Sequence, residues 1–231
     1  MTPIRTCVLV GAFFALAGAA GADTMPPLSQ FLMPAQTEIA LARSAAPASI
    51  SSHATIMVLG THGYTVAVQG SDGFTCLVER AWMQPYNKKP FWNLKFQAPV
   101  CYNAVASRSV LLYTFKRTAL ALGGATESQI EQTMQAAIAA KTLPIPPPDA
   151  FAFMMSKNQD FGGGTGSWYP HLMFYMPRAD MAHNGESWGA DRLRSPVVYD
   201  AADMMPEPWA QFFIPVSHWS DGSAAPLYSG T

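Results

Sequence analysis

Three short runs of apolar and β-branched residues stand close together in the first half of the chain, at 54–59, 64–69 and 74–79. Two four-residue linkers, each beginning and ending with glycine, separate these runs. Short glycine-containing linkers between runs of this kind are typical of consecutive hairpins. The pattern therefore predicts an antiparallel meander over 54–80.

Helical periodicity precedes and follows this meander. The segments 35–45 and 110–122 have the apolar spacing and the length of helices. A third helix is predicted to begin at Thr126, which forms a capping-box pattern with Gln129. From Ile130 onward an apolar residue recurs at every fourth position, as one face of a helix requires.

Strand-like runs return after the proline-rich segment 144–148. They lie at 151–156, 169–176, 196–199 and 209–216. The proline segment is either a domain boundary or a helix-to-strand connection, and we favour the connection because neither flank alone carries enough apolar strands for a core. The predicted fold class is therefore α+β, a single domain in which an antiparallel sheet carries about three helices packed on one side.

The N-terminus has the pattern of a cleavable signal peptide. Arg5 precedes an apolar run over 7–20, and small residues close the segment at Ala20 and Ala22. Fourteen residues in a helix reach only about 21 Å, which is short of a hydrocarbon core of about 30 Å. We therefore expect residues 1–22 to be removed and 23–231 to form an exported domain, periplasmic or secreted, with no membrane span.

Composition narrows the partners and the cysteine chemistry. Hydrophobic residues make up 49% and charged residues 13% of the chain, which is typical of a folded protein. The net charge of −1 and the lack of a dense basic block argue against a nucleic-acid partner. Removal of the signal peptide would take Cys7 with it and leave Cys76 and Cys101, which we expect to form a disulfide; two buried thiols are the alternative.

Candidate catalytic residues are few. His171 lies in an otherwise apolar strand-like run, where it is either a structural histidine or a general acid or base. Glu79 and Arg80 end a strand and point to opposite faces, so one of them projects inward unless both are solvated. An inward charge needs a partner, and the candidates are His171, Glu38 and Lys157. A hydrolase would use His171 with Glu79 or Glu38.

Other signatures of chemistry are incomplete. The glycine-rich segment 162–167 lacks the lysine of a phosphate-binding loop. No compact metal-ligand spacing occurs, so a metal would have to be held by His171 with residues from distant segments. Aromatic residues such as Trp92 and Trp168, with Arg80, either line a ligand cleft or supply core area.

Three segments resemble a family of uncharacterised exported bacterial proteins. They are 38–47, 73–80 and 170–175, and the likeness extends over most of the chain after the signal peptide. The resemblance implies a bacterial exported protein and assigns no catalytic residue. Our expectation is a non-catalytic protein that binds a small molecule or an envelope protein. A hydrolase and a metal-binding protein are the alternatives, and the cofactor is unknown.

Overall fold

A computed structural model describes residues 24–86, 90–162, 169–178, 197–199 and 206–226. The predicted signal peptide and Trp168 lie outside the described residues. The helical elements, in chain order, are η1 (Leu28–Gln30), α1 (Ala35–Arg43), α2 (Ala48–Ser51), η2 (Ala81–Met83), α3 (Ala104–Ser107), α4 (Val110–Leu122) and α5 (Glu127–Ala139). The strands are β1 (Thr55–Gly60), β2 (Gly63–Val68), β3 (Thr75–Glu79), β4 (Ala98–Tyr102), β5 (Phe151–Met154), β6 (His171–Pro177), β7 (Val197–Tyr199) and β8 (Trp209–Pro215).

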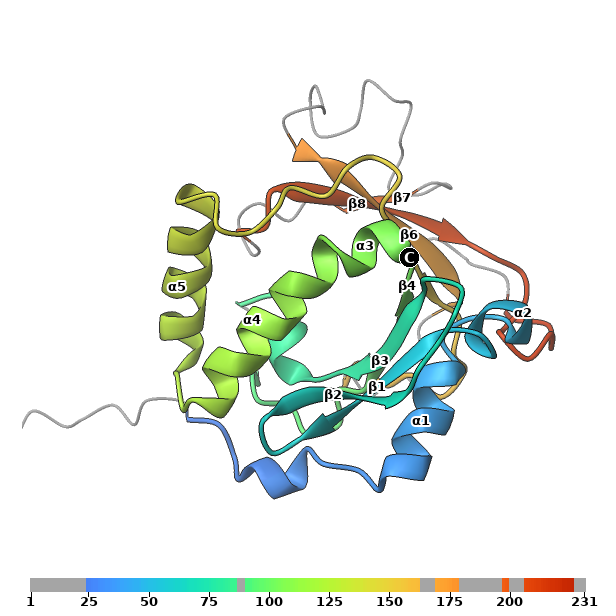
Figure 1. The fold of residues 1–231 in the computed structure, drawn as a ribbon, viewed down its shortest axis with the longest axis horizontal. Coiled ribbons are helices and arrows are strands. Elements are labelled where there is room, and N and C mark those ends of the chain that lie inside the picture. The colour runs from blue at the N-terminus through green and yellow to red at the C-terminus, as the bar shows by residue number, and fades with distance from the viewer. Residues whose placement is uncertain (1–23, 87–89, 163–168, 179–196, 200–205, 227–231) are drawn as a thin grey trace, which may run out of the picture.

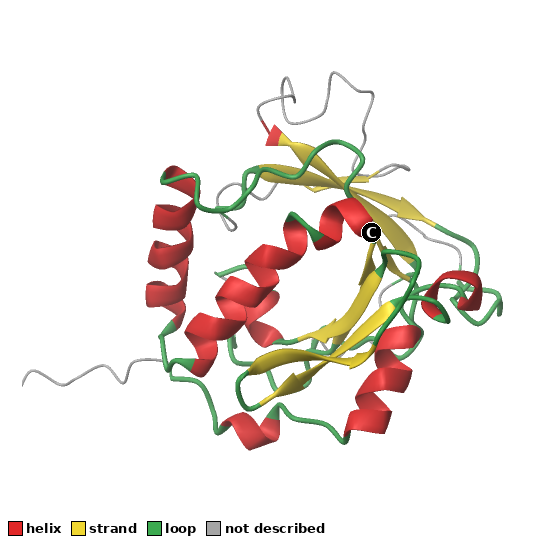
Figure 2. Ribbon diagram, viewed as in Figure 1, coloured by secondary structure: helices red, strands yellow, loops and turns green. Residues whose placement is uncertain are grey.

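The eight described strands form one sheet in the order β2-β1-β3-β4-β5-β6-β8-β7. All neighbouring pairs are antiparallel except β1 and β3. Figure 1 and Figure 2 show this sheet bending around α4. The α+β class is confirmed, and β5 joins the sheet directly after the proline-rich segment. That segment is therefore a helix-to-strand connection.

The meander predicted over 54–80 is wrong in its second half. β1 and β2 form the expected hairpin, but β3 pairs with the other side of β1, and it does so in parallel. The chain crosses the beginning of β1 at Gly70, whose amide donates a hydrogen bond to the Thr55 hydroxyl. A Cβ atom on Gly70 would lie 2.2 Å from the Thr55 backbone nitrogen, so only glycine fits this crossing.

Helices cover both faces of the sheet, whereas the sequence predicted them on one side. Cys76 and Val78 of β3 pack in one cluster with Ala42 of α1. Leu77, between them on the strand, packs instead with residues of α4. Because neighbouring strand residues point to opposite faces, α1 and α4 lie on opposite sides of β3. Figure 1 shows the same arrangement.

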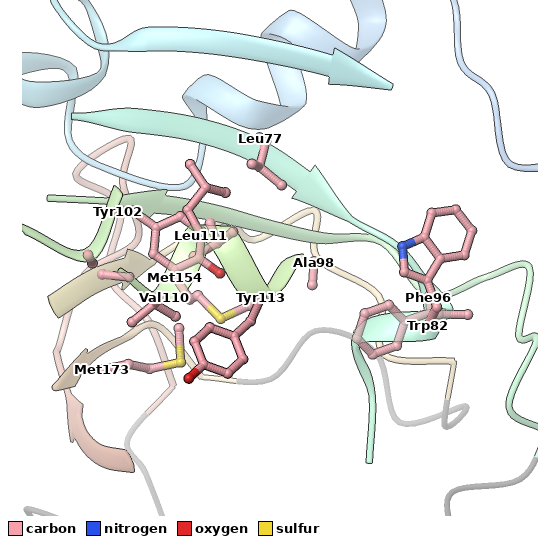
Figure 3. Packing of buried hydrophobic residues seen from close by; sticks show 14 of the residues in the cluster. Leu77, Trp82, Phe96, Ala98, Tyr102, Val110, Leu111, Tyr113, Met154 and Met173 are labelled. Atoms are coloured by element: carbon pink, nitrogen blue, oxygen red, sulfur yellow. The ribbon is translucent and has the colours of Figure 1, made fainter. Parts of the chain in front are cut away.

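The larger core lies between the sheet and α4. Its members include Leu77 of β3, Tyr102 of β4, Tyr113 of α4 and Met173 of β6, and Figure 3 shows these side chains packed together. The helix α4 turns a wide buried stripe toward the sheet. This stripe also contains polar residues, and they build the candidate site.

The predicted α5 cap is confirmed. The Thr126 side chain accepts a hydrogen bond from the Gln129 amide, and the Gln129 side chain accepts one from the Thr126 amide. Ile130 and Met134 are buried, as the four-residue spacing predicts. The anchored N-terminus fixes α5 next to α4, with which it makes contact.

Candidate functional site

A carboxylate lies on the α4 side of the sheet. Glu79 is the last residue of β3, and alternation along the strand turns it toward α4. The Tyr102 phenol donates a 2.6 Å hydrogen bond to Glu79 Oε1, and the Thr114 hydroxyl donates a 3.0 Å bond to the same oxygen. Tyr175 of β6 lies beside them, with its ring 6.3 Å from that of Tyr102. We call Glu79, Tyr102, Thr114 and Tyr175 the Glu79 cluster.

Burial raises the pKa of Glu79 above its usual value. The hydrogen bonds from Tyr102 and Thr114 and the charge of Arg117 act in the opposite direction, and Glu207 adds to the rise. Tyr102, Thr114 and Tyr175 are almost fully buried, but Glu79 keeps part of its surface accessible. Both hydrogen bonds that the described residues donate to Glu79 go to Oε1, so Oε2 can accept a further one.

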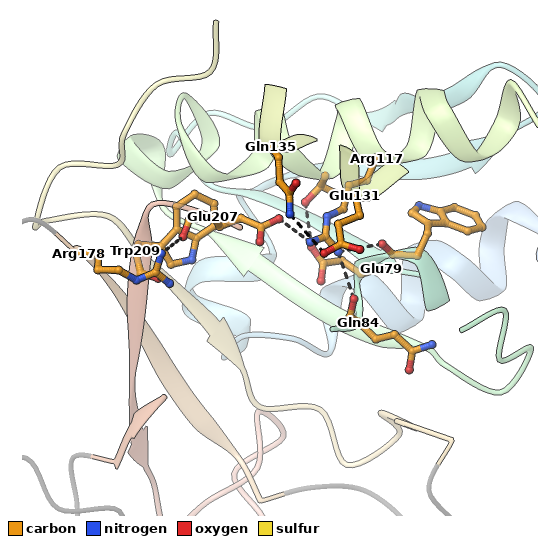
Figure 4. Close-up of polar contacts among 10 residues, drawn as sticks. Glu79, Gln84, Arg117, Glu131, Gln135, Arg178, Glu207 and Trp209 are labelled. Atoms are coloured by element: carbon orange, nitrogen blue, oxygen red, sulfur yellow. Dashed lines mark hydrogen bonds and ion pairs between the residues drawn. The ribbon is translucent and has the colours of Figure 1, made fainter. Parts of the chain in front are cut away.

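One turn further along α4, Arg117 forms a second polar group. Arg117 Nη2 donates a 2.5 Å hydrogen bond to Glu207 Oε1, and Nη1 donates to the carbonyls of Trp82 and Gln84 at 3.1 Å each. The guanidinium carbon lies 4.2 Å from the centre of the Tyr86 ring. We call Tyr86, Arg117 and Glu207 the Arg117 cluster. Figure 4 shows Arg117 between Glu207 and Gln84, with Glu79 nearby.

The two clusters form one electrostatic centre. The charges of Arg117 and Glu207 both act on Glu79, and Glu79 in turn acts on Arg117. Two carboxylates therefore share a single guanidinium. The charge of Glu131 on α5 reaches Tyr86 as well. The centre thus contains more acidic than basic side chains. It is buried, and a buried charge without a partner lowers the stability of the fold.

Three buried atoms of the Arg117 cluster have no hydrogen-bond partner within the described chain. They are Tyr86 Oη, Arg117 Nε and Glu207 Oε2. Tyr86, Arg117 and Glu207 are each at least 96% buried. Buried polar atoms in native proteins are almost always satisfied by protein, water or ligand. Three such atoms in one cluster therefore mark a place for a polar molecule.

Glu38 and Arg80 form a separate buried ion pair. Arg80 Nη2 donates a 2.8 Å hydrogen bond to Glu38 Oε1, and the Leu59 amide donates to the same oxygen at 3.1 Å. The remaining donors of Arg80 bind the carbonyls of Phe31 and Val78. Both side chains are at most 1% exposed. The pair ties α1 to the sheet, and Arg80 has no free surface for the ligand binding that we predicted.

His171 lies at the beginning of β6, where the sequence placed it, and is fully buried. Its Nδ1 is 2.8 Å from the Tyr169 carbonyl, and its ring packs edge-on against Phe213. Burial lowers the pKa of His171 to about 4. Tyr175, a member of the Glu79 cluster, is four residues further on, about 13 Å along a strand. The structure thus keeps His171 apart from Glu79, while Glu38 is bound by Arg80.

The aromatic residues after β3 supply core area. Trp92 is 5% exposed and its ring meets that of Phe91 edge-on, while Trp82 donates a hydrogen bond to the Thr118 hydroxyl. The alternative interpretation, that these rings supply core area, fits them better, because they pack against other aromatic rings of the core. Trp168 lies outside the described residues, so its role stays a prediction.

Cys76 and Cys101 are joined by a disulfide, as predicted. They occupy directly opposite positions on β3 and β4, and both are fully buried. Within the parts of the chain that the structure describes, no group of three or more His, Cys, Asp or Glu side chains is arranged to hold a metal ion. None of the described helices is long and apolar enough to cross a membrane.

Sequence reasoning missed most of the two clusters. Arg117 carried a usable signal, because Val110, Thr114, Arg117 and Ala121 lie on one helical face and three of them look like core positions. An arginine on such a face needs a buried partner. Glu207 carried no comparable signal, since it follows Arg117 by 90 residues in an irregular segment.

The chain matches no protein-family model, no curated protein and no solved structure. The two clusters are therefore the features of this molecule that indicate a function.

Proposed function

We propose that this is an exported bacterial protein that binds a small polar molecule, without catalysis, at the Glu79 and Arg117 clusters. The observation that carries the proposal is the Glu79 carboxyl. It lies on the α4 side of the sheet, keeps part of its surface accessible, and forms no ion pair with any of the described residues. Groups with strongly perturbed pKa values at such places are candidates for functional sites.

A purely structural role explains this arrangement less well. In the Glu38–Arg80 pair each charge has a direct partner of opposite sign. Glu79 is held by two neutral hydroxyls, and the nearest guanidinium already binds Glu207. A carboxyl retained there costs stability, because its pKa is raised by burial. Binding a ligand gives a reason for keeping it.

Three observations support export. The Cys76–Cys101 disulfide suits an oxidising compartment. The N-terminal segment has the order of a signal peptide. The resemblance of 38–47, 73–80 and 170–175 points to exported bacterial proteins. Expression of the full chain in a bacterium, followed by N-terminal sequencing of the exported product, should find Asp23 or a near neighbour at the new terminus.

Binding can be tested by thermal unfolding with a panel of sugars, carboxylic acids, alcohols and amines. A compound present at ten times its Kd adds about 1.4 kcal/mol of stability, which is about 3 to 6 °C for a domain of this size. We expect at least one class to raise the Tm of the wild type, and we expect Glu79→Gln to abolish that rise. Asp149→Asn is the matched control, because it removes an exposed carboxylate elsewhere. A flat panel, or equal rises in wild type and Glu79→Gln, would contradict the proposal.

A further inference from the structure

The charges and the unused hydrogen-bonding atoms of the two clusters specify the kind of ligand. With Glu79 ionised, two carboxylates, Glu79 and Glu207, face one guanidinium, that of Arg117. These three side chains together carry one net negative charge. Glu131 adds to the negative potential at Tyr86. A cation would balance this charge, and an anion would increase it.

The guanidinium of Arg117 has little left to offer an anion. Nη1 already donates to two carbonyls and Nη2 to Glu207. Nε and one N–H of Nη2 remain, but a phosphate or carboxylate bound there would stand beside two carboxylates. This argues against an acidic ligand.

Oxygen atoms dominate the positions that remain open. Glu79 keeps part of its surface accessible and its Oε2 accepts no hydrogen bond from the described residues, and Glu207 Oε2 and Tyr86 Oη are buried without partners in the described chain. All three can accept a hydrogen bond, and an ammonium group supplies three N–H donors. Beside them, Tyr64 and Phe115 pack with ring centres 6.3 Å apart and are only partly buried. The Tyr64 hydroxyl donates a 2.6 Å hydrogen bond to the carbonyl of Val78, the residue before Glu79, and Phe115 follows Thr114 on α4, so these rings lie near the cluster.

Resting on the proposed function, we infer that the ligand is a primary amine: its ammonium group takes donor positions toward Glu79, Glu207 and Tyr86, and an apolar portion packs against Tyr64 and Phe115. The ammonium then supplies the cation that the second carboxylate lacks. A neutral molecule of the same shape would leave that carboxylate unmatched.

Isosteric probes separate the charge of the ligand from its shape. Benzylamine and benzyl alcohol share a ring and differ in the ammonium group, and benzoate reverses the charge. By isothermal titration calorimetry at pH 8 we expect benzylamine to bind at least tenfold more tightly than benzyl alcohol, and benzoate not to bind. Glu79→Gln should weaken benzylamine binding at least tenfold, whereas Asp149→Asn should leave it unchanged.

Tyr86→Phe is a second variant that tests the same site without disturbing the fold. Among the described residues, Tyr86 Oη has no hydrogen-bond partner that the substitution would remove. The Tm of the ligand-free protein should therefore stay the same or rise. Benzylamine binding should nevertheless weaken several-fold. If Tyr86→Phe binds benzylamine as tightly as the wild type does, Tyr86 is not part of the site.

The outcomes distinguish the two proposals. If benzyl alcohol or benzoate binds more tightly than benzylamine and loses affinity in Glu79→Gln, the amine inference fails and the binding site stands. If none of the three probes binds, the amine inference fails, and the broader panel decides the proposed function. If benzylamine binds equally to wild type, Glu79→Gln and Tyr86→Phe, the site is elsewhere and both proposals fail.

Discussion

The phenol of Tyr102 and the carboxyl of Glu79 are joined by a 2.6 Å hydrogen bond that crosses from β4 to β3. The Tyr102 hydroxyl is the donor, so the bond stabilises the ionised carboxyl and opposes the effect of burial on its pKa. The Tyr102 pKa is itself raised, first by burial and then by the Glu79 charge. The raised pKa keeps the Tyr102 phenol protonated, so it stays a hydrogen-bond donor to Glu79.

Tyr102→Phe should show how much this hydrogen bond contributes to the free energy of unfolding. Hydrogen bonds to charged groups contribute about 1.5 to 3 kcal/mol, whereas neutral ones contribute about 1 kcal/mol. We therefore expect the variant to lose more stability at pH 8 than at pH 4, because a higher pH favours the ionised carboxyl, which the bond stabilises. Urea unfolding at the two pH values measures the difference. An equal loss at both would mean that Glu79 does not change charge between them.

The Glu38–Arg80 pair predicts a strong and non-additive effect on stability. Removing one partner of a buried pair leaves an uncompensated charge and costs about 3 to 5 kcal/mol. Glu38→Gln and Arg80→Met should each lower the free energy of unfolding by an amount in that range. The double variant Glu38→Leu/Arg80→Met should lose less than the sum, because it leaves no charge behind.

Lys157 offers the matched comparison for this pair. It forms an ion pair with Asp221, and both side chains are largely exposed. Exposed pairs contribute little, so Lys157→Met should leave the unfolding midpoint nearly unchanged. If the Glu38 and Arg80 variants behaved like Lys157→Met, the pair would not hold α1 to the sheet.

The lowered pKa of His171 predicts that the protein loses stability in mild acid. Its pKa is about 4 in the folded protein against 6.5 in the unfolded chain. Above pH 6.5 both states are neutral, but between 6.5 and 4 only the unfolded chain takes up the proton. Stability therefore falls as the pH is lowered through that range, by about 3 kcal/mol in full. Glu79 shifts in the opposite direction, so the effect of His171 must be isolated by a variant.

His171→Gln provides that isolation, because glutamine can donate to the Tyr169 carbonyl and does not titrate. The difference in unfolding free energy between wild type and variant, measured by urea unfolding from pH 4 to 8, should change in favour of the variant as the pH falls. A difference that is constant with pH would show that the pKa of His171 is the same in the folded protein and in the unfolded chain. It would also reopen a catalytic role at neutral pH.

Local signals in the sequence predicted the elements well. The helix over 110–122 has the predicted bounds, and the Thr126 cap is present as expected. Strand pairing was predicted less well, because the linkers after β1 and β2 have the same glycine-bounded form. Only the second brings Gly70 against the Thr55 backbone and sends the chain across β1. That contact depends on tertiary packing, which periodicity does not report.

The candidate site was predicted in part. Strand alternation placed Glu79 and Arg80 on opposite faces, and Glu38 was among the partners considered for an inward charge. The pairing of Arg117 with Glu207 joins residues 90 positions apart, and no local pattern connects them. β4 was also missed, since its five residues include Pro99 and follow an aromatic loop. Long-range contacts therefore decide which charged residues form the site.

The disulfide predicts a defined contribution to stability, because Cys76 and Cys101 are 25 residues apart. Closing a loop of that length removes chain entropy from the unfolded state and contributes about 3.5 kcal/mol. Cys76→Ala/Cys101→Ala should lose about that amount in guanidinium unfolding, with a larger m value because its unfolded chain is less compact. Since both sulfurs are buried, folded wild type should resist a reductant that cleaves the bond once the protein is denatured. Alkylation followed by mass measurement separates the two cases, and ready reduction without denaturant would contradict the buried position.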